Sequence, residues 1–352
     1  MDTNSMDTKQ NLTLSIAARS PQELLGQMSR LYVLSRSIHA IAELGVANLI
    51  GDAPVSAPDV ASAAGVSSEY LARCLRFLAA YGVFEETSSN WFRATALSNL
   101  MRDDHPQTMR PVLRMVSSEW WDAVGRLPEV VRSERSGTEL AHGESFFALL
   151  KQRPELQRRF NDGMSSISRM DDETLAAAYD FSGPGVVADI AGGEGNFLRE
   201  VLRKSPQRTG VLFDQPQVLA ESTLLDEFAR DGRVKLVPGN LFEVLPAPAD
   251  IYVLKGTLHD FADQQAIAIL RNCASVMRPS DKLLVIEQVV PTGNVPHPNK
   301  TMDMVMMFLL GGKQRSLQEW GELFARAGLR SGRVTPTPTP YTILEVGLDS
   351  GR

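Results

Sequence analysis

The chain has 352 residues, of which 43% are hydrophobic and 22% are charged, and its formal net charge is −6. This is the composition of an ordinary globular protein with room for two or three folding units. The acidic balance gives no general attraction to nucleic acid or to an anionic membrane. The two cysteines, Cys74 and Cys273, lie far apart in the sequence and predict neither a disulfide framework nor a metal site.

The polar N-terminus, residues 1–18, is expected to be a disordered tail. It carries Asp2 and Asp7 and lacks the basic and then apolar order of a signal peptide. The chain contains no run of about 18 uncharged apolar residues, so we expect no membrane span and no membrane partner. The default expectation is a cytoplasmic protein.

Residues 19–110 have the order of elements of a winged-helix domain. Between residues 21 and 50, apolar side chains recur every three or four positions and predict an amphipathic helix that ends at Gly45. Two shorter helices follow, with Ser56 and Ser67 as their expected N-caps. A small hairpin comes next, with strands expected at 83–86 and 91–95. A DNA reader needs a basic face, whereas residues 1–110 contain more Asp and Glu than Lys and Arg. We therefore expect no nucleic-acid partner.

The segment 111–180 is predicted to be a helical linker, with breaks at Pro111, Pro128, Gly137 and Pro154. From 181 to 352, short apolar strands alternate with helices. The strands are expected at 186–190, 210–213, 234–237, 250–254, 282–289, 332–335 and 341–348. This alternation predicts an α/β, Rossmann-like, doubly wound parallel sheet, with the ligand at the carboxyl ends of the strands. A Thr-Pro repeat at 335–340 excludes a central strand there.

The nine residues VADIAGGEG at 187–195 are the most informative stretch. A buried strand runs into a turn with almost no side chains, made of Ala191, Gly192, Gly193 and Gly195, and a helix is predicted over 196–204. Glycines in such a turn let backbone N–H groups approach a polar ligand. Asp189 in the same stretch is unfavourable to a phosphate but favourable to a cation. This combination points to the positively charged nucleotide S-adenosylmethionine (SAM).

Further cofactor contacts are predicted at the ends of the next strands. Asp214 ends a strand in the sequence FDQP, with Gln215 beside it, and its carboxylate can accept hydrogen bonds from both ribose hydroxyls. The sequence GNLF and the fourth strand then complete the predicted site around an adenine, with Asn240, Leu241, Phe242 and Lys255.

Other interpretations of these residues remain open. The glycines also fit a tight strand-to-helix turn in any α/β domain, and Asn240 and Leu241 fit a surface turn and a core residue. A dinucleotide such as NAD fits less well. The pattern G-x-G-x-x-G, when started at Gly193, has Leu198 in its third glycine position.

A catalytic group is predicted within DIYVLKGTLHDFADQQA at 250–266. His259 follows a central strand and lies beside the predicted ligand, although a lone histidine is more often structural. Glu287 ends an apolar strand and, if buried, needs a partner because an unpaired buried charge is costly; the alternative is an exposed strand end. Glu319 opens the helix that begins near Ser316, where a carboxylate also favours the helix dipole.

These residues suit methyl transfer from a sulfonium to a hydroxyl. The donor already carries a good leaving group, so the protein must align the acceptor and remove its proton. A phenol has a pKa of about 10 and an imidazole one of about 6.5. A carboxylate on the second imidazole nitrogen fixes the tautomer and raises the basicity of the ring. No metal is required.

Six motifs in combination resemble the SAM-dependent O-methyltransferases of the caffeate and hydroxyindole type, including bacterial enzymes that methylate phenazines and anthracyclines. They are VADIAGGEG, FDQP, GNLF, LKGTLHDF, the IE pair at 286–287 and GGKQRSLQEWGELFARAGL at 311–329. The resemblance implies that His259 is the general base and that Glu287 and Glu319 flank it. It also implies homodimerisation through the winged-helix region, which closes part of the partner's substrate pocket.

Two positions depart from the family pattern. Ala191 stands where glycine is usual, and its methyl group is tolerated if the backbone angle is ordinary. Asn240 stands where aspartate is usual; its amide oxygen can still accept a hydrogen bond from the adenine amino group, but without charge. A lower cofactor affinity is therefore expected.

The acceptor pocket is expected to be apolar and shaped for a flat aromatic ring. A methionine-rich helix around Asp303 fits plain core, yet methionine also makes favourable contacts with aromatic surfaces, and in the family this segment lines the acceptor site. The candidates are Trp120, Phe147, Phe160, Asn161, Met164, Met302, Asp303, Met306 and Met307. A phenol, a hydroxyphenazine or a polyketide-like acceptor is favoured over a sugar or a small acid.

Two further functions stay open. A homologue that binds SAM in a decarboxylation or hydroxylation has less need of His259, Glu287 and Glu319. N-methylation of a ring nitrogen requires no proton removal, so His259 is then dispensable.

Overall fold

The computed structural model describes residues 20–220, 222–246 and 248–349. The tail predicted at 1–18 lies outside these residues. The described chain folds as two compact units, the first within Met1–Ser117 and Glu155–Ser166 and the second within Ser118–Pro154 and Ile167–Arg352. None of the helices in the described residues is long and apolar enough to cross a membrane.

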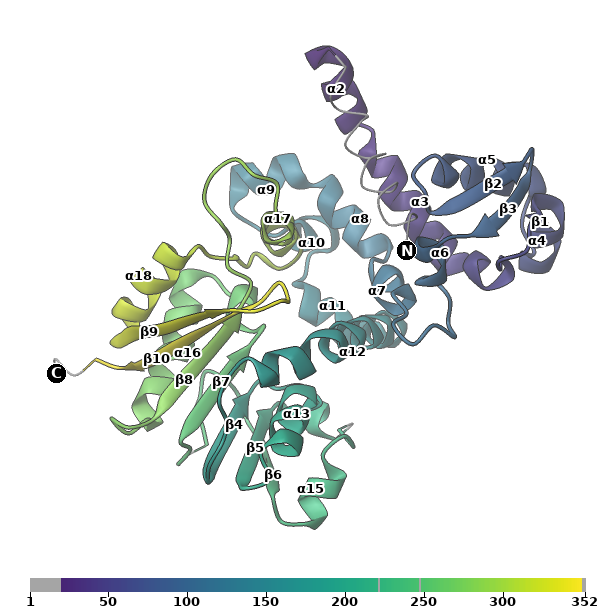
Figure 1. The fold of residues 1–352 in the computed structure, drawn as a ribbon. Helices are drawn as coiled ribbons and strands as arrows, with labels where there is room; N and C mark the ends of the chain where they lie inside the picture. Colours follow the sequence, from purple (N-terminus) through teal and green to yellow (C-terminus); the bar gives the residue numbers. More distant parts are fainter. Residues whose placement is uncertain (1–19, 221, 247, 350–352) are drawn as a thin grey trace. The chain divides into compact units, whose positions relative to one another are not determined.

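The first unit combines short helices with an antiparallel sheet in the order β1-β3-β2 (Figure 1). Its core includes the fully buried side chains of Ile41, Leu75, Phe84 and Phe92. Its elements are α2 (Pro21–Met28), α3 (Leu31–Leu44), the 3-10 helix η1 (Val46–Leu49), β1 (Val55–Ser56), α4 (Ala57–Ala64), α5 (Ser68–Ala79), β2 (Phe84–Ser88), β3 (Trp91–Ala94), α6 (Ala96–Asn99) and α7 (Arg110–Met115).

The single helix expected before Gly45 is divided at Ser29 and Arg30. The Ser29 hydroxyl donates to the carbonyl of Gly26 (2.9 Å), and Arg30 leaves the helical region with φ −107° and ψ 2°. A serine that bonds to a nearby backbone group competes with the helical hydrogen-bond ladder. The expected end at Gly45 is confirmed, because this glycine adopts φ +67° after α3.

The serine caps of the next two helices differ from each other. The Ser56 hydroxyl accepts a hydrogen bond from the N–H of Asp59 (3.3 Å), as expected for an N-cap. Ser67 occupies the predicted N-cap position of α5, but its side chain makes no capping hydrogen bond.

The second unit begins with the helices α8 (Ser118–Gly125), α9 (Leu127–Ser133), α10 (Gly137–His142) and α11 (Phe146–Gln152), and it also contains the end of α12 (Pro154–Ala177). Each residue predicted to break a helix stands in the first turn of one: Pro111 in α7, Pro128 in α9, Gly137 in α10 and Pro154 in α12. Proline is tolerated there because the N–H that it lacks has no partner in that turn.

A sheet with the strand order β6-β5-β4-β7-β8-β10-β9 fills the rest of the second unit (Figure 1). The strands β4 to β8 pair in parallel, and β10 pairs antiparallel with both β8 and β9. The predicted doubly wound sheet is therefore confirmed. Its strands are β4 (Gly185–Ile190), β5 (Arg208–Asp214), β6 (Val234–Pro238), β7 (Ile251–Lys255), β8 (Lys282–Glu287), β9 (Leu329–Pro336) and β10 (Thr342–Leu348).

Helices cover both faces of this sheet. One apolar layer lies under α16 and α18, and the other lies under α13, α15 and the end of α12 (Figure 1). β6 and β9 are the two edges, and Pro336 ends β9, in agreement with the exclusion of the Thr-Pro repeat from a central strand. The helices of this part are α13 (Asn196–Lys204), α14 (Pro216–Leu219), α15 (Asp226–Arg230), α16 (Asp263–Val276), α17 (Pro298–Leu310) and α18 (Leu317–Ala327), with the 3-10 helix η2 (Leu258–Asp260).

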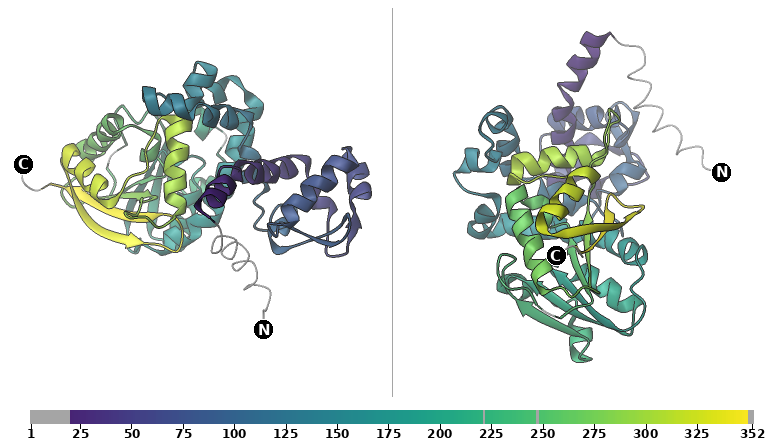
Figure 2. Two further views of the ribbon diagram at one scale, coloured as in Figure 1. Left: turned by 90° about the horizontal axis from the view of Figure 1, so that it is seen from above. Right: turned by 90° about the vertical axis from the view of Figure 1, so that its left-hand side faces the viewer.

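Helix α17 packs against α8 and α10 (Figure 2). The approach of α10 depends on Gly137, because a Cβ at this position would lie 2.2 Å from the carbonyl oxygen of Ala123 and 2.9 Å from that of Phe308. The Thr138 hydroxyl donates to the carbonyl of Leu309 (2.8 Å) and ties α10 to α17. The methionine-rich helix is thus held at a fixed distance from α10.

We expect Gly137→Ala to lower the free energy of unfolding by about 1–3 kcal/mol, because the added methyl group forces α10 away from α8 and α17. Urea denaturation of the full chain measures this change. The matched control is Gly125→Ala, since a Cβ at Gly125 meets no atom within 4 Å. Equal stability of the two variants would contradict the close packing described here.

Candidate active site

The carboxyl ends of four adjacent parallel strands bring the predicted site residues together. β5, β4, β7 and β8 lie side by side in this order and lead to Asp214, Ala191, Lys255 and Glu287. The chain passes from β4 to β5 on one side and later returns to β7 on the other side of β4. A sheet binds ligands at such a point of reversal, outside the carboxyl ends of its strands.

The glycine turn after β4 is fixed to the end of β5. The N–H of Gly193 donates to Asp214 Oδ2 (2.8 Å), the N–H of Gln215 donates to Asp214 Oδ1 (2.6 Å), and the N–H of Ala191 donates to the carbonyl of Phe213 (2.8 Å). Each carboxylate oxygen can accept more than one hydrogen bond. Asp214 therefore remains able to accept ribose hydroxyls while it holds the turn.

Ala191 has φ +56°, in the left-handed region. The methyl group of Ala191 is expected from the sequence to be tolerated if the backbone angle is ordinary. The observed angle is not ordinary, so this expectation loses its basis. A non-glycine residue pays a strain energy in this conformation. The glycine usual in the family fits the observed backbone better than alanine does.

Asp189 is a buried carboxylate with no ion-pair partner in the part of the chain that the structure describes. Its side chain is 1% exposed, and neither oxygen has a hydrogen-bond partner of regular geometry among the described residues. Burial raises its pKa to about 7; Asp172 and Asp214 act in the same direction, whereas Lys255 and the N–H of Leu198 oppose it. Such an oxygen pair can receive a cationic group without displacing an existing bond.

Lys255 ends β7 and forms an ion pair with Asp172 of α12, in which Nζ lies 2.9 Å from Oδ1. The Lys255 ammonium also lies 5.9 Å from the centre of the Tyr341 ring. Burial lowers the pKa of Lys255, but the attraction of Asp172 and of the other acidic groups outweighs burial and raises it. The lysine is therefore held in its charged form.

The residues predicted around an adenine form a turn after β6. Asn240 Oδ1 accepts a hydrogen bond from the N–H of Phe242 (3.1 Å), and Asn272 Nδ2 donates to the carbonyl of Leu241 (2.8 Å). The Phe242 ring meets Phe261 edge to face and remains 45% exposed. Gln215 is exposed. The contacts of these residues with an adenine stay predictions.

The residues present fit SAM. The cofactor carries an ammonium group, ribose hydroxyls and a sulfonium. Asp189 offers an unpartnered buried carboxylate, and Asp214 offers a carboxylate at the next strand end. Gly192 lets the backbone of the turn lie close to the first of these, because a Cβ there would lie 2.6 Å from the Asp189 carboxylate. Both features favour a cationic nucleoside over an anionic phosphate.

His259 lies in η2, directly after β7, and is paired with Glu287 of β8. His259 Nδ1 is 2.7 Å from Glu287 Oε2, and Glu287 Oε1 accepts from the N–H groups of Thr257 (3.0 Å), Leu258 (2.8 Å) and His259 (3.3 Å). Glu287 has no exposed surface. It is therefore a partnered buried carboxylate and not an exposed strand end.

The protonation of His259 depends on two carboxylates. Burial lowers the pKa of the imidazole, but Glu287 and Asp260 outweigh burial and raise it to about 9. Asp260 Oδ1 lies 3.4 Å from His259 Nε2, and burial raises the pKa of Asp260 to about 6. With Nδ1–H donated to Glu287, Nε2 is the ring nitrogen that remains for proton transfer, with Asp260 as its neighbour.

Glu319 makes its contacts elsewhere. It forms a capping box with Ser316 at the start of α18, and its second oxygen lies 2.6 Å from Lys313 Nζ. Burial raises the pKa of Glu319, but these partners outweigh it and lower the pKa to about 2. No hydrogen bond or ion pair found in the described residues joins Glu319 to His259. The place of Glu319 beside the imidazole stays a prediction. Its observed contacts are those of a carboxylate in the first turn of a helix, the alternative interpretation of this residue.

Arg315 holds the loop that carries His259. Its buried guanidinium donates to the carbonyls of Leu258 (3.1 Å) and Phe261 (2.9 Å) and to Asp263 Oδ1 (2.8 Å), and it lies 5.2 Å from the Trp320 ring centre. Five fixed donors let arginine bridge several carbonyls at once. The ends of η2 are thus fixed from outside the sheet.

The predicted acceptor residues are divided between the two units of the chain. Trp120 of α8 meets Phe146 edge to face, and the neighbouring Phe147 is 42% exposed. Met306 is buried and Met302 and Met307 are half-buried on α17, while Asp303 accepts a hydrogen bond from the N–H of Gln314 (2.9 Å). The remaining candidates, Phe160, Asn161 and Met164, belong to the first unit. That all of them line one pocket stays a prediction.

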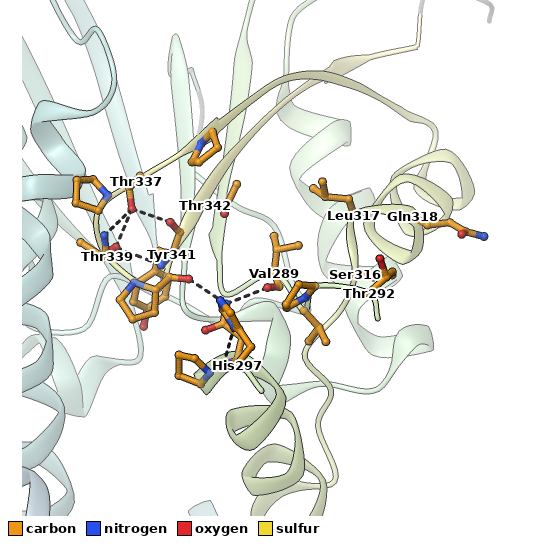
Figure 3. Close-up of a pocket in the computed structure, with 17 residues that line it drawn as sticks. Val289, Thr292, His297, Ser316, Leu317, Gln318, Thr337, Thr339, Tyr341 and Thr342 are labelled. Carbon is orange, nitrogen blue, oxygen red and sulfur yellow. Dashed lines mark hydrogen bonds between the residues drawn. The ribbon is translucent and has the colours of Figure 1, made fainter. Parts of the chain in front are cut away.

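A hollow of about 710 Å³ lies beside the turn between β9 and β10 (Figure 3). The segments 289–292, 297–299, 316–318 and 336–342 line it, and among the described residues none of the predicted site residues does so. Thr337 donates to the carbonyl of Tyr341 (2.7 Å) and fixes the turn. Tyr341 links the hollow with the site, because its ring also faces Lys255.

Comparison with known proteins identifies the family. Residues 125–330 match the O-methyltransferase domain, and residues 27–104 match the O-methyltransferase dimerisation domain. The chain belongs to the O-methyltransferase family. The resemblance predicted from the motifs is confirmed, and with it the enzyme class, a SAM-dependent O-methyltransferase.

Relatives match nearly the whole chain. The phenazine O-methyltransferase PhzM of Lysobacter antibioticus is 37% identical over 323 residues, which cover 92% of this chain and 95% of that protein. The 8-amino-8-demethylriboflavin N,N-dimethyltransferase of Streptomyces davaonensis is 31% identical over 314 residues, which cover 88% and 90%. The structure of NcsB1, an O-methyltransferase from neocarzinostatin biosynthesis in complex with SAM and 2-hydroxy-5-methyl naphthoic acid, has a TM-score of 0.79 and 32% identity and covers 90% and 96%.

Three residues of the site were missed by the sequence analysis. Asp172 shares a helix face with Leu175 and Ala176, which pack in the core, so its spacing could have marked it as a buried acid. Arg315 and Tyr341 had no such signal, because their partners are distant in the sequence.

We expect Ala191→Gly to raise the free energy of unfolding by about 0.5–1 kcal/mol, because relief of the left-handed strain exceeds the entropy that glycine adds to the unfolded chain. Thermal unfolding measures this change. The contrasting variant is Gly192→Ala, whose Cβ meets the Asp189 carboxylate at 2.6 Å and should destabilise the turn. A less stable Ala191→Gly variant would contradict strain at this position.

Proposed function

We propose that this enzyme transfers the methyl group of SAM to a hydroxyl of a flat aromatic natural product, with His259 as the general base. The observation that carries the proposal is the buried His259–Glu287 pair, joined by a contact of 2.7 Å, at the strand end next to the glycine turn. A carboxylate on Nδ1 fixes the tautomer that leaves Nε2 able to accept a proton.

The cofactor supplies an electrophilic methyl group that is bonded to its sulfonium. Once the methyl group is transferred, the sulfonium is the thioether of S-adenosylhomocysteine. Asp189 binds the ammonium end, and Asp214 binds the ribose while it fixes the turn through Gly193. His259 removes the acceptor proton at Nε2, and Glu287 stabilises the imidazolium that forms. This division of roles is supported by the unpartnered oxygens of Asp189 and the saturated ones of Glu287.

The acceptor class is supported by apolar residues and by the names of the relatives. Trp120, Phe147 and the methionines of α17 offer aromatic and sulfur surfaces, which suit a flat ring. PhzM is named for phenazines, and NcsB1 is solved with a naphthoic acid. A phenol or a hydroxyphenazine is therefore the first acceptor to test.

N-methylation is the second candidate, because one relative is an N,N-dimethyltransferase. An amine acceptor attacks through a lone pair and can lose its proton to water afterwards. His259 is then dispensable. A reaction other than methyl transfer, such as decarboxylation, would leave SAM unconsumed.

A homodimer formed through the first unit belongs to the same proposal. The match of residues 27–104 to a dimerisation domain supports it. So do exposed apolar side chains on α2 and α3, where Leu25 is 69%, Met28 57% and Tyr32 63% exposed. Apolar groups gathered in this way usually mark a contact with another protein surface.

The direct test is incubation with methyl-labelled SAM and a panel of aromatic hydroxy compounds and matched aromatic amines. Mass spectrometry should show one added methylene unit on a hydroxy compound, together with S-adenosylhomocysteine. Transfer to amines alone would support the second candidate. Failure of every acceptor while SAM stays bound and unconsumed would contradict methyl transfer to this class.

We expect His259→Ala to lower kcat with a phenolic acceptor by about 10²–10⁴-fold, because general-base assistance is lost. Calorimetry should show an unchanged Kd for SAM. Asp214→Ala provides the contrast, since it should weaken SAM binding. Unchanged turnover by His259→Ala would remove the base from the mechanism.

We expect kcat/KM for SAM to rise with pH up to about 9, the pKa of His259, because the base must be neutral to accept a proton. The carboxylate of Glu287 raises that pKa. Glu287→Gln should therefore move the rising part of the pH–rate profile to lower pH, and it should also lower the maximal rate. A pH–rate profile of both proteins with one phenol measures this. If the rise occurs at the same pH in both proteins, the pH dependence belongs to ionisation of the phenol and not to His259.

A further inference from the structure

The interior below the glycine turn holds more negative than positive charge. Asp189 of β4 and Asp172 of α12 are 1% and 2% exposed, and Lys255 is the ammonium that faces them. Lys255 Nζ lies 2.9 Å from Asp172, whereas neither oxygen of Asp189 has a hydrogen-bond partner of regular geometry among the described residues, although the N–H of Leu198 faces it. One buried carboxylate is thus compensated, and the other is not.

The other acidic groups around this pair have partners of their own. Asp214 at the end of β5 accepts the N–H groups of Gly193 and Gln215. Glu200 of α13 lies 3.2 Å from Arg199 and 2.7 Å from Arg203. These contacts stabilise both carboxylates. Asp171, beside Asp172, also interacts with Lys255 but is only half-buried, so Asp172 and Asp189 are the two buried carboxylates between which Lys255 can turn.

We propose that Asp172 is a positioning residue for the cofactor, which holds the Lys255 ammonium on α12 and so leaves the Asp189 carboxylate to the ammonium group of SAM. The inference rests on the proposed place of SAM. Without Asp172, the buried lysine turns to the remaining carboxylate, because an unpaired charge in the interior is costly. The lysine then competes with the cofactor for Asp189.

The first test is Asp172→Asn, which keeps the shape of the side chain and removes its charge. Calorimetry with the full chain should show a Kd for SAM raised about tenfold, the size of one lost charged hydrogen bond. Asp171→Asn is the matched control: this neighbouring, half-buried carboxylate also interacts with Lys255 at longer range, but forms no ion pair with it among those found in the described residues. It should leave the Kd within about twofold.

The second test is a double-mutant cycle with Lys255→Met. If Asp172 acts only through Lys255, Asp172→Asn has no harmful effect on SAM affinity in the Lys255→Met background. The double variant removes both members of the Lys255–Asp172 pair, so neither leaves the other unpaired, and it keeps the test valid if Asp172→Asn alone unfolds. Weaker binding by the same factor in both backgrounds would show a direct or merely structural role and overturn the proposal.

The pH dependence of SAM binding gives a readout that a structural role would not change. The groups facing Asp189 are Lys255 from β7, Asp172 from α12, Asp214 from β5 and the N–H of Leu198 from α13. Binding of an ammonium needs Asp189 ionised, so the affinity of the native enzyme should fall below about pH 7. In Asp172→Asn, the lysine beside Asp189 lowers that pKa, and the fall should move to lower pH.

The two proposals fail in different ways. If the native enzyme does not bind SAM, the proposed function fails. If the native enzyme binds SAM and Asp172→Asn binds it equally well with the same pH dependence, the role of Asp172 fails and the proposed function stands.

Discussion

The bond between Glu287 and the His259 loop is the constraint on which the site depends. A carboxylate with no exposed surface is stable only when every lone-pair direction finds a donor, and here three backbone N–H groups and an imidazole supply them. The same bonds fix the backbone of η2 and the tautomer of the ring. Arg315 holds that loop from its other side. Chemistry and local folding therefore share one set of contacts.

Two acidic residues of the sheet, on strands that lie on either side of β7, differ in how their buried charge is balanced. Glu287 is saturated by donors, whereas Asp189 has none of regular geometry within the described residues. A saturated carboxylate orients its neighbours and does not need a ligand. An unsaturated one stores an unfavourable energy that a cationic ligand can relieve on binding. The site thus separates the group that organises the protein from the group that receives the cofactor.

Local pattern predicted the sheet and the glycine turn because strands, prolines and glycines act through their immediate neighbours. Proline broke the helices at the positions expected, and α13 has the bounds that its spacing predicts. Local pattern failed at Ser29, where a side chain competes with the helix, and at Ala191, whose backbone angle the sequence does not reveal. Arg315 and Tyr341 were missed for another reason: each acts on a partner more than fifty positions away, across the fold.

The open sheet ends in an antiparallel pair whose outer strand is long. An unprotected outer strand offers a row of free backbone groups to any other chain, which is a route to fibres. β9 carries the exposed Arg330 and Arg333 and closes on Pro336, with Pro338 and Pro340 in the turn beyond. Charge repels a second copy, and proline has no N–H to give it. The Thr-Pro turn that shapes one wall of the hollow thus also guards the enzyme against self-association through its sheet.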